Sequence, residues 1–466
     1  MNRTASRENG TRRGAIVVLF AVLMIVIFAM LAFAVDLGFV ALTRTQLQVA
    51  ADAAALAGAG TMVGGTEAAE AEVRRYIDLH QQQGSPVDES RTEIRFGNWD
   101  TQTRRFDPGA EEVNAIDVAV HSRARPFFFA RVLGRDEFDS QARAIASFSP
   151  RDIMLVLDFS GSMCFDSQLS SIDTLGRVMV EENLQQIYSD LGSPRFGKMQ
   201  WTPKSIPGNS TQQVKSALGL TKVPYPYPSG SWDNYISYVM TDSDINRAGY
   251  RRRYGYLTWI NYLQAEQCRH AQTPDLWMTR EQPVTAVKDS VDLLVAYLQE
   301  NCPHDRLGLS IYTASDSTAI LECEFTNDFA EVAEKTRHRQ AGHYNIYTNI
   351  YDGMKTGRLE FERNGRSSAG KLMVLMTDGQ ANLPQNEKTA KRRALEEAHA
   401  AAAARIPIVT ISLGAGADTD LMQQIADITK GVYFEIPGGQ PVADYEEQLK
   451  DVFRRVASDR KLALVQ

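Results

Sequence analysis

Residues 14–35 form an uninterrupted apolar run without a single charged residue. A run of this length can cross the hydrocarbon core of a bilayer, about 30 Å thick, as one α-helix. It therefore predicts one transmembrane helix. A cleaved secretory signal is the alternative, because basic residues precede the run, although the apolar core of such a signal is usually only about 7–15 residues long.

Basic residues are distributed unevenly around this run: Arg3, Arg7, Arg12 and Arg13 precede it, and Arg44 follows it. Cytoplasmic flanks of membrane helices are enriched in Lys and Arg. The bias predicts a cytoplasmic tail at residues 1–13 and an extracytoplasmic chain after about Asp36. The protein is thus expected to be a single-pass protein of the cell (inner) membrane, with its bulk in the periplasm or outside the cell.

The segment after the apolar run, Leu47–Ala59, is rich in alanine, the best helix former. The membrane helix is therefore expected to continue into it. Beyond this segment, patterning predicts a helix near 66–82, a short apolar helix at 126–133, and strands near 92–99, 114–122 and 137–148. Residues 36–149 should accordingly form a long helix with a small α/β module.

Two short apolar runs each lead into an acidic residue flanked by small polar residues. Ile153–Leu157 precedes Asp158-Phe159-Ser160-Gly161-Ser162, and Leu372–Met376 precedes Thr377-Asp378-Gly379. Short continuous apolar runs are typical of buried parallel strands. If the two strands are neighbours, Asp158 and Asp378 lie at one carboxyl edge, where open α/β sheets bind ligands.

These strand ends indicate a metal site. Two carboxylates held close together are unfavourable unless a proton or a cation lies between them. Small loop residues let nearby hydroxyls converge on the same point, and Mg²⁺ prefers oxygen ligands. The candidate ligands are Asp158, Ser160, Ser162, Thr348 and Asp378. The expected ion is Mg²⁺, with Mn²⁺ or Ca²⁺ possible.

Strands and helices alternate after Gln282. Helices are expected at about 283–300, 327–339, 348–358, 386–404, 418–428 and 441–457, and strands at 306–313, 318–324, 406–412 and 431–436. This alternation predicts an α/β fold with a doubly wound, mainly parallel sheet.

The Asp-x-Ser-x-Ser, Thr and Thr-Asp-Gly elements resemble those of the von Willebrand factor type A domain, which form a metal-ion-dependent adhesion site (MIDAS). The resemblance covers residues 150–164 and about 283–458, so the domain would span 150–458, with a tail at 459–466. It implies hydroxyl ligation by the two serines and Thr348, with both aspartates acting largely through bound water. The family usually has Gly where this chain has Tyr347.

Residues 13–59 resemble the N-terminal region of TadG-like proteins of Tad (Flp) pilus assembly, most clearly in Ala34–Gly38 and Leu47–Ala57. Those proteins often carry a von Willebrand A domain downstream. Type IV prepilins usually have Glu five residues past their processing Gly, whereas this chain has Leu19 there, so prepilin processing is not expected. A generic anchor with an alanine-rich stalk is the alternative.

An insert at about 164–282 interrupts the domain and holds four of the five tryptophans and nine of the 17 tyrosines. Its ends should lie near the sheet edge that carries the candidate metal ligands, so the insert could confer specificity for a binding partner. Alternatively its aromatics form a separate core, which is the reading favoured for Trp259, Tyr262 and Leu263. Tyr225-Pro226-Tyr227-Pro228 is expected to be an exposed extended loop.

Four cysteines, Cys164, Cys268, Cys302 and Cys323, fall in the extracytoplasmic part, where disulfides can persist. The preferred pairing is Cys302–Cys323 with Cys164–Cys268, and four reduced, buried cysteines are the alternative. A net charge of −7 argues against nucleic-acid binding, and Arg251-Arg252-Arg253 is read as solvated surface.

Three functions remain. The favoured one is a membrane-anchored binding protein whose cation holds an acidic group of a protein partner, in Tad-type pilus assembly, anchoring or surface adhesion. A structural envelope component with a vestigial metal site is the second. A metal-dependent hydrolase is the third, and it is disfavoured because Ser160 and Ser162 have no evident histidine partner; His338 and His343 are expected to be surface residues. The protein is therefore expected not to be an enzyme.

Overall fold

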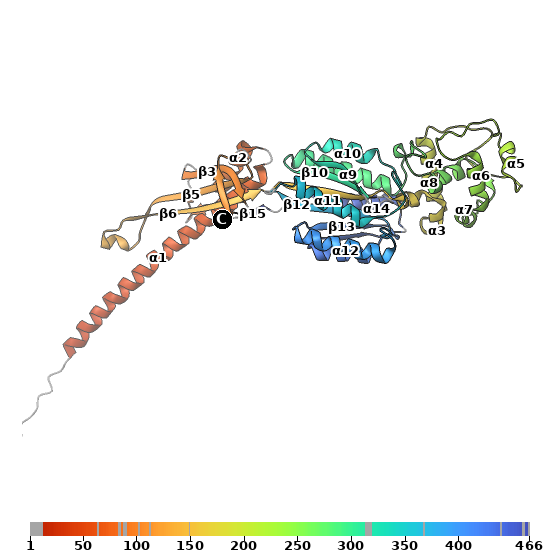
Figure 1. The fold of residues 1–466 in the computed structure, drawn as a ribbon. Helices are drawn as coiled ribbons and strands as arrows, with labels where there is room; N and C mark the ends of the chain where they lie inside the picture. The colour runs from red at the N-terminus through yellow and green to blue at the C-terminus, as the bar shows by residue number, and fades with distance from the viewer. Residues whose placement is uncertain are drawn as a thin grey trace, which may run out of the picture. The chain divides into compact units, whose positions relative to one another are not determined.

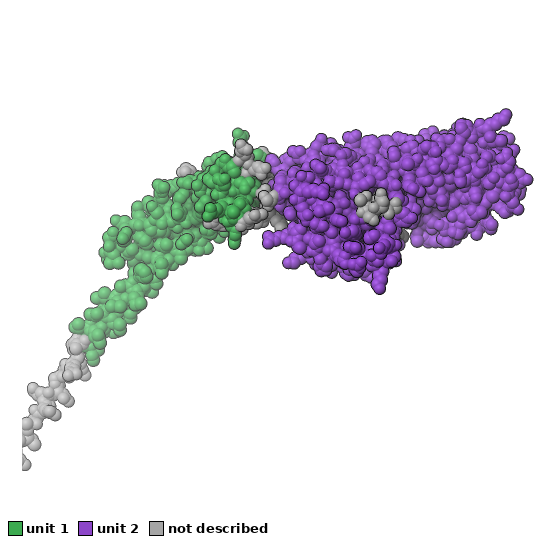
Figure 2. Space-filling model, viewed as in Figure 1, with its two compact units in different colours: residues 1–149, 461–466 green, residues 150–460 purple. Residues whose placement is uncertain are grey.

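The computed structural model divides into two compact units, residues 1–149 with 461–466 and residues 150–460 (Figure 2). It describes residues 13–62, 65–82, 85–86, 91–100, 103–110, 113–148, 150–312, 319–366, 369–438, 440–458 and 462–464. The arginines at positions 3, 7 and 12, on which the predicted orientation rests, lie outside the described residues.

Helix α1 (Arg13–Thr61) dominates the first unit (Figure 1). Its 49 residues continue without a break from the apolar run into the alanine-rich segment, as the sequence predicted. At 1.5 Å per residue the helix is about 74 Å long, more than twice the thickness of a hydrocarbon core. Its apolar first half is exposed, whereas Leu47, Ala50 and Ala54 are fully buried in the unit's core. One end of the helix is thus suited to lipid and the other to protein.

An antiparallel sheet packs against the second half of α1, in the order β15-β6-β5-β3-β4. Its strands are β3 (Thr92–Asp100), β4 (Arg105–Pro108), β5 (Ala115–Pro126), β6 (Glu137–Phe148) and β15 (Leu462–Leu464). Helix α2 (Thr66–Leu79) lies against α1. A Cβ at Gly58 would stand only 2.5 Å from Cγ2 of Val73, so glycine permits this close approach.

The second unit contains a six-stranded sheet in the order β11-β10-β7-β12-β13-β14, in which only the β10–β11 pair is antiparallel. The strands are β7 (Arg151–Asp158), β10 (Arg306–Tyr312), β11 (Ile320–Thr326), β12 (Gly370–Thr377), β13 (Ile408–Leu413) and β14 (Tyr433–Ile436). The predicted doubly wound, mainly parallel sheet is confirmed.

Helices cover both faces of this sheet (Figure 1). On one face α9 (Val284–Asn301), α10 (Phe329–Arg337) and α14 (Val442–Ser458) share a core with Ile153, Leu155 and Leu157 of β7. On the other, α11 (Ile350–Asn364), α12 (Glu387–Ala403) and α13 (Thr419–Thr429) share a core with Met154 and Val156. Because alternate side chains of β7 enter opposite cores, every residue of the strand is buried.

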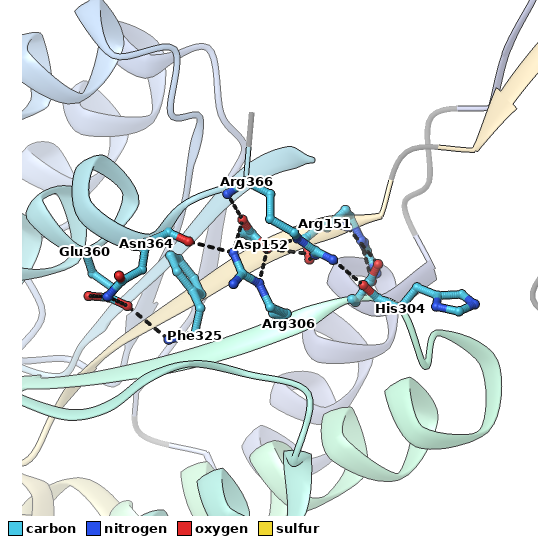
Figure 3. Close-up of polar contacts among 9 residues, drawn as sticks. Arg151, Asp152, His304, Arg306, Phe325, Glu360, Asn364 and Arg366 are labelled. Carbon is cyan, nitrogen blue, oxygen red and sulfur yellow. Dashed lines mark hydrogen bonds and ion pairs between the residues drawn. The ribbon is translucent and has the colours of Figure 1, made fainter. Parts of the chain in front are cut away.

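The amino end of β7 is fixed by a charged network (Figure 3). Asp152 accepts hydrogen bonds from the guanidinium groups of Arg306 (2.8 and 2.9 Å) and Arg366 (2.9 Å). Burial alone raises the pKa of Asp152, but the hydrogen bonds and charges of the two arginines outweigh it and lower the pKa below its ordinary value. This network lies at the opposite end of the strand from Asp158.

The insert folds around a core of its own, with α4 (Arg177–Asp190), α6 (Trp232–Thr241) and α8 (Tyr256–Glu266) as its longest helices. Trp259 is fully buried there, in agreement with the packing interpretation. The expectation of an exposed Tyr225–Pro228 loop was correct for the two prolines, which are exposed, but wrong for the two tyrosines, which are half-buried. Both tyrosine rings pack on the insert core, Tyr225 edge-on to Trp232 (5.2 Å) and Tyr227 stacked on Trp259 (6.1 Å).

All four cysteines are free and buried, so the preferred disulfide pairing was wrong and the alternative of four reduced thiols holds. The Sγ of Cys302 lies 4.0 Å from Arg151 at the start of β7. Cys323 belongs to β11 and lies opposite Leu309 of the neighbouring strand β10. The two thiols therefore pack against different elements. Burial raises the pKa of Cys268 to about 12, which keeps that side chain a neutral thiol.

Candidate metal centre

Strand β7 ends at Asp158, and the next residues turn back over its carboxyl end. The backbone N–H of Ser160 donates to Oδ1 of Asp158 (2.8 Å), and both residues are fully buried. The N–H of Gly161 donates to the carbonyl of Ile346 (3.1 Å). The serine loop, Ser160-Gly161-Ser162, is therefore hydrogen-bonded to the segment that leads into Thr348.

Strand β12 places Asp378 beside this loop. Because β12 pairs with β7 in parallel, with Met376 opposite Leu157, the two strands end at the same level. The hydroxyl of Thr377 donates to Oδ2 of Asp158 (2.8 Å). That of Ser162 donates to Oδ1 of Asp378 (2.6 Å). The predicted neighbourhood of the two acidic strand ends is thus present.

The serine hydroxyls are oriented by these contacts. Ser160 Oγ and Ser162 Oγ lie 3.0 Å apart. A hydroxyl that donates its hydrogen to a carboxylate keeps its lone pairs for another partner. Both oxygens of Asp158 already accept a hydrogen bond, an arrangement suited to a carboxylate that acts through water.

Thr348 is buried just before α11 and faces the same point. A Cβ at Gly379 would lie 3.3 Å from Ser162 Oγ and 3.6 Å from Thr348 Oγ1, so both hydroxyls face this glycine. The side chain of Asn382 accepts a hydrogen bond from the Thr348 N–H (2.9 Å). The structure thus brings all five candidates together, and Asn382 is a positioning residue that no local sequence signal revealed.

Two ionised carboxylates are unfavourable in this pocket unless a proton or a cation is bound. Burial raises the pKa of Asp158 to about 6. Burial, and then repulsion from Asp158, raises the pKa of Asp378 well above its ordinary value. Burial also raises the pKa of Asp166, another pocket residue, to about 6. Asp166 lies only a few positions after the serine loop and could have been proposed from the sequence.

The donor set fits a hard divalent cation, because it consists of carboxylate and hydroxyl oxygens. Across the described residues, no cluster of three or more His, Cys, Asp or Glu side chains could hold a metal ion. A site here would therefore depend on the hydroxyls and on water as much as on the two aspartates.

Three of the five candidates, Ser162, Thr348 and Asp378, border a cavity of about 670 Å³, and Asp158 and Ser160 are fully buried behind them; the insert builds part of the cavity's other side. The insert contributes Gln168, Ser170, Ser171, Thr174, Asp244 and Gln264 to this lining. Gln282 at the end of the insert donates its N–H to Ser167 Oγ at the beginning (2.8 Å), so both ends meet beside the pocket. The insert thus forms one wall of the entrance to the candidate site.

The histidines lie elsewhere. His343 is buried, contrary to expectation, and stacks on His270 (4.6 Å). Burial and then the nearby Arg339 lower the pKa of His343 to about 3. His338 is half-buried against Trp277. Within the described part of the chain, no histidine is hydrogen-bonded to Ser160 or Ser162.

Three family models match separate parts of the chain. Residues 14–61 match the Flp pilus-assembly TadE/G-like family, and residues 41–146 match the Tad-like Flp pilus-assembly family. Residues 277–448 match the von Willebrand factor type A domain. The last match includes Thr348 and Asp378 but begins after the serine loop, within the last residues of the insert. No curated protein matches the chain.

Solved structures with similar folds are distant in sequence. The conserved hypothetical protein BatB from Bacteroides thetaiotaomicron is 16% identical over 38% of this chain and 91% of that chain, with a TM-score of 0.29. The vWF domain of the type V pili tip protein Mfa5 from Porphyromonas gingivalis is 13% identical over 39% and 90%, with a TM-score of 0.29. Manganese-loaded TRAP from Plasmodium vivax is 16% identical over 39% and 68%, also at 0.29.

Proposed function

Because the chain joins Tad-like Flp pilus-assembly regions to a von Willebrand factor type A domain, we propose that it is a membrane-anchored binding protein that holds an acidic group of an envelope or pilus partner through a divalent cation. Helix α1 anchors it in the cell (inner) membrane. The arginine bias before the helix supports a cytoplasmic N-terminus, with the second unit in the periplasm or outside the cell.

The convergence of the candidate ligands carries this proposal. Ser160, Ser162 and Thr348 would hold Mg²⁺ directly, and Asp158 and Asp378 through water. The bound ion would supply an electrophilic position for a partner's carboxylate. Mn²⁺ and Ca²⁺ use the same oxygen donors and remain alternatives.

The proposal includes no catalytic step. A nucleophilic serine is usually activated by an adjacent histidine, and within the described part of the chain no histidine is hydrogen-bonded to Ser160 or Ser162. The buried His343 pairs with His270 instead. The alternative function is that of a structural envelope component, and a measurement of metal binding distinguishes the two.

Calorimetric titration of the full chain in detergent with Mg²⁺ and Mn²⁺ tests the site. Asp378→Asn should weaken binding at least about tenfold, because losing even a supporting group of a metal site has that effect. Asp427→Asn, which alters an exposed carboxylate of the same unit, is the matched control. Equal metal affinity in wild type and Asp378→Asn, or absence of binding in both, would contradict the proposal and favour a structural role.

A further inference from the structure

The tip of the β5–β6 hairpin exposes large apolar side chains. Phe128 is 60% exposed, Val132 88% and Leu133 85%, and the 3₁₀ turn η3 (Ala130–Leu133) carries two of them. Large apolar side chains gathered on one surface are unfavourable in water and mark a contact with a partner or a membrane. The tip therefore needs an apolar environment that the first unit does not itself provide.

Asp36 fastens this tip to the end of the apolar run in α1. Its carboxylate accepts hydrogen bonds from the backbone N–H groups of Phe128 (2.9 Å), Phe129 (3.1 Å) and Ala130 (2.7 Å). Phe39 adds an edge-on ring contact to Phe128 (4.7 Å). These contacts fix the height of the tip along the helix, beside the end of the apolar run.

A cavity of about 900 Å³ separates the tip from α1 and is almost entirely apolar. Phe28, Leu31 and Val35 line it from the helix, and Phe129, Val132 and Leu133 line it from the hairpin. Side chains of the hairpin thus stand level with the last two turns of the apolar run. If those turns lie in hydrocarbon, the tip lies there too.

Charged residues bound this apolar tip. Arg131 and Arg135 are exposed within it, and Asp136 and Glu137 follow at the start of β6. Arginine can extend its charged end to lipid phosphates while its stem stays in an apolar layer. If the tip enters a membrane, the acidic pair would lie where the hairpin leaves it.

We propose that the β5–β6 tip is a second membrane contact, inserted into the same leaflet as the end of the apolar run, with phospholipid acyl chains filling the cleft beside α1. This inference requires α1 to cross the membrane but is independent of the metal centre. Two contacts would fix the orientation of the first unit on the bilayer, whereas a helix alone would leave it free to rotate.

Full-length protein reconstituted into phosphatidylethanolamine–phosphatidylglycerol vesicles tests the proposal. Leu133→Trp places a tryptophan at the tip, and Leu79→Trp, at an exposed leucine of α2, is the matched control. Lipids brominated near the headgroup should quench the tip tryptophan strongly, since an interfacial element lies about 5–10 Å into the headgroup and acyl boundary. The control should be quenched weakly.

A second variant separates insertion from misfolding. Val132→Asp combined with Leu133→Trp should retain the helical circular dichroism of the parent and lose the quenching, because a charge in the acyl region is unfavourable. Equal quenching at the tip and the control position would overturn the proposal. So would a tip tryptophan that stays accessible to a water-soluble quencher, which would point to a protein partner for this surface.

Discussion

At the scale of single residues, the proposed metal centre depends on the hydrogen bonds that each candidate oxygen already makes. Ser162 donates its hydrogen to Asp378 and leaves its lone pairs for another partner. Asp158 already accepts two hydrogen bonds, so it serves better as a fixed charge than as a direct ligand. Residue types and their positions at strand ends nominated this set, the family resemblance implied the different roles within it, and the hydrogen bonds are consistent with those roles.

The raised pKa values of the two aspartates predict a specific pH dependence. The pKa of Asp158 is about 6 in the folded protein and 3.8 as an unperturbed group. As pH rises between these values, the unfolded chain releases this proton first, so the metal-free fold loses stability. A cation reverses the effect, because it favours both ionised carboxylates.

The increase in Tm caused by saturating Mg²⁺ should therefore be small at about pH 5 and larger at about pH 7. Thermal scans of the full chain at both pH values, with and without chelator, measure it. Asp378→Asn should abolish the difference. A Mg²⁺-induced shift that is the same at both pH values would contradict this assignment of the carboxylates.

At the scale of elements, β7 connects two polar centres at its opposite ends. Asp158 belongs to the candidate metal centre, and Asp152 accepts hydrogen bonds from Arg306 and Arg366. Removing one partner from a buried ion network leaves uncompensated charge, which costs about 3–5 kcal/mol. Without Asp152, Arg306 and Arg366 would each keep a positive charge that no carboxylate at this position compensates.

Asp152→Ala should accordingly lower the free energy of unfolding by about 3–5 kcal/mol. Urea denaturation followed by tryptophan fluorescence would measure the change, since four tryptophans lie in the second unit. Asp427→Ala, at an exposed position, should change stability by less than about 0.5 kcal/mol. A similar small effect in both variants would show that the network contributes little.

The elements of the parallel sheet were predictable because each is encoded by a local apolar run. Strand β7 and helix α9 lie within one or two residues of their expected positions. The prediction for helix α11 was less accurate, because the helix begins at Ile350 and extends to Asn364, beyond the expected end at 358. The pairing of β15 with β6 was not predictable, because the partners Leu464 and Ala146 are far apart in the chain and β15 has only three residues.

At the scale of the whole molecule, the candidate metal pocket combines the carboxyl edge of the parallel sheet with the insert. The sheet edge provides the candidate ligands, and the insert provides a wall beside them. Sequence reasoning placed the ends of the insert near the metal edge but could not identify the wall residues, because the tertiary packing of the insert core selects them. A substitution in the insert wall should therefore change the selection of the partner without changing the affinity for the ion.

Thr174→Trp tests this separation. Thr174 is exposed and lines the pocket from the insert, away from the candidate ligands. A bulky side chain there should narrow the entrance while leaving Mg²⁺ affinity within about twofold of wild type, because the hydrogen bond that is lost, from the Thr174 hydroxyl to the Ser171 carbonyl (3.0 Å), does not involve a candidate ligand. Pull-downs from envelope extracts with Mg²⁺ or chelator should show reduced Mg²⁺-dependent capture by this variant.

Val178→Trp, at an exposed apolar position of the insert, is the matched control. If both variants capture partners as wild type does, the insert acts only as a packed appendage and selection resides in the sheet edge.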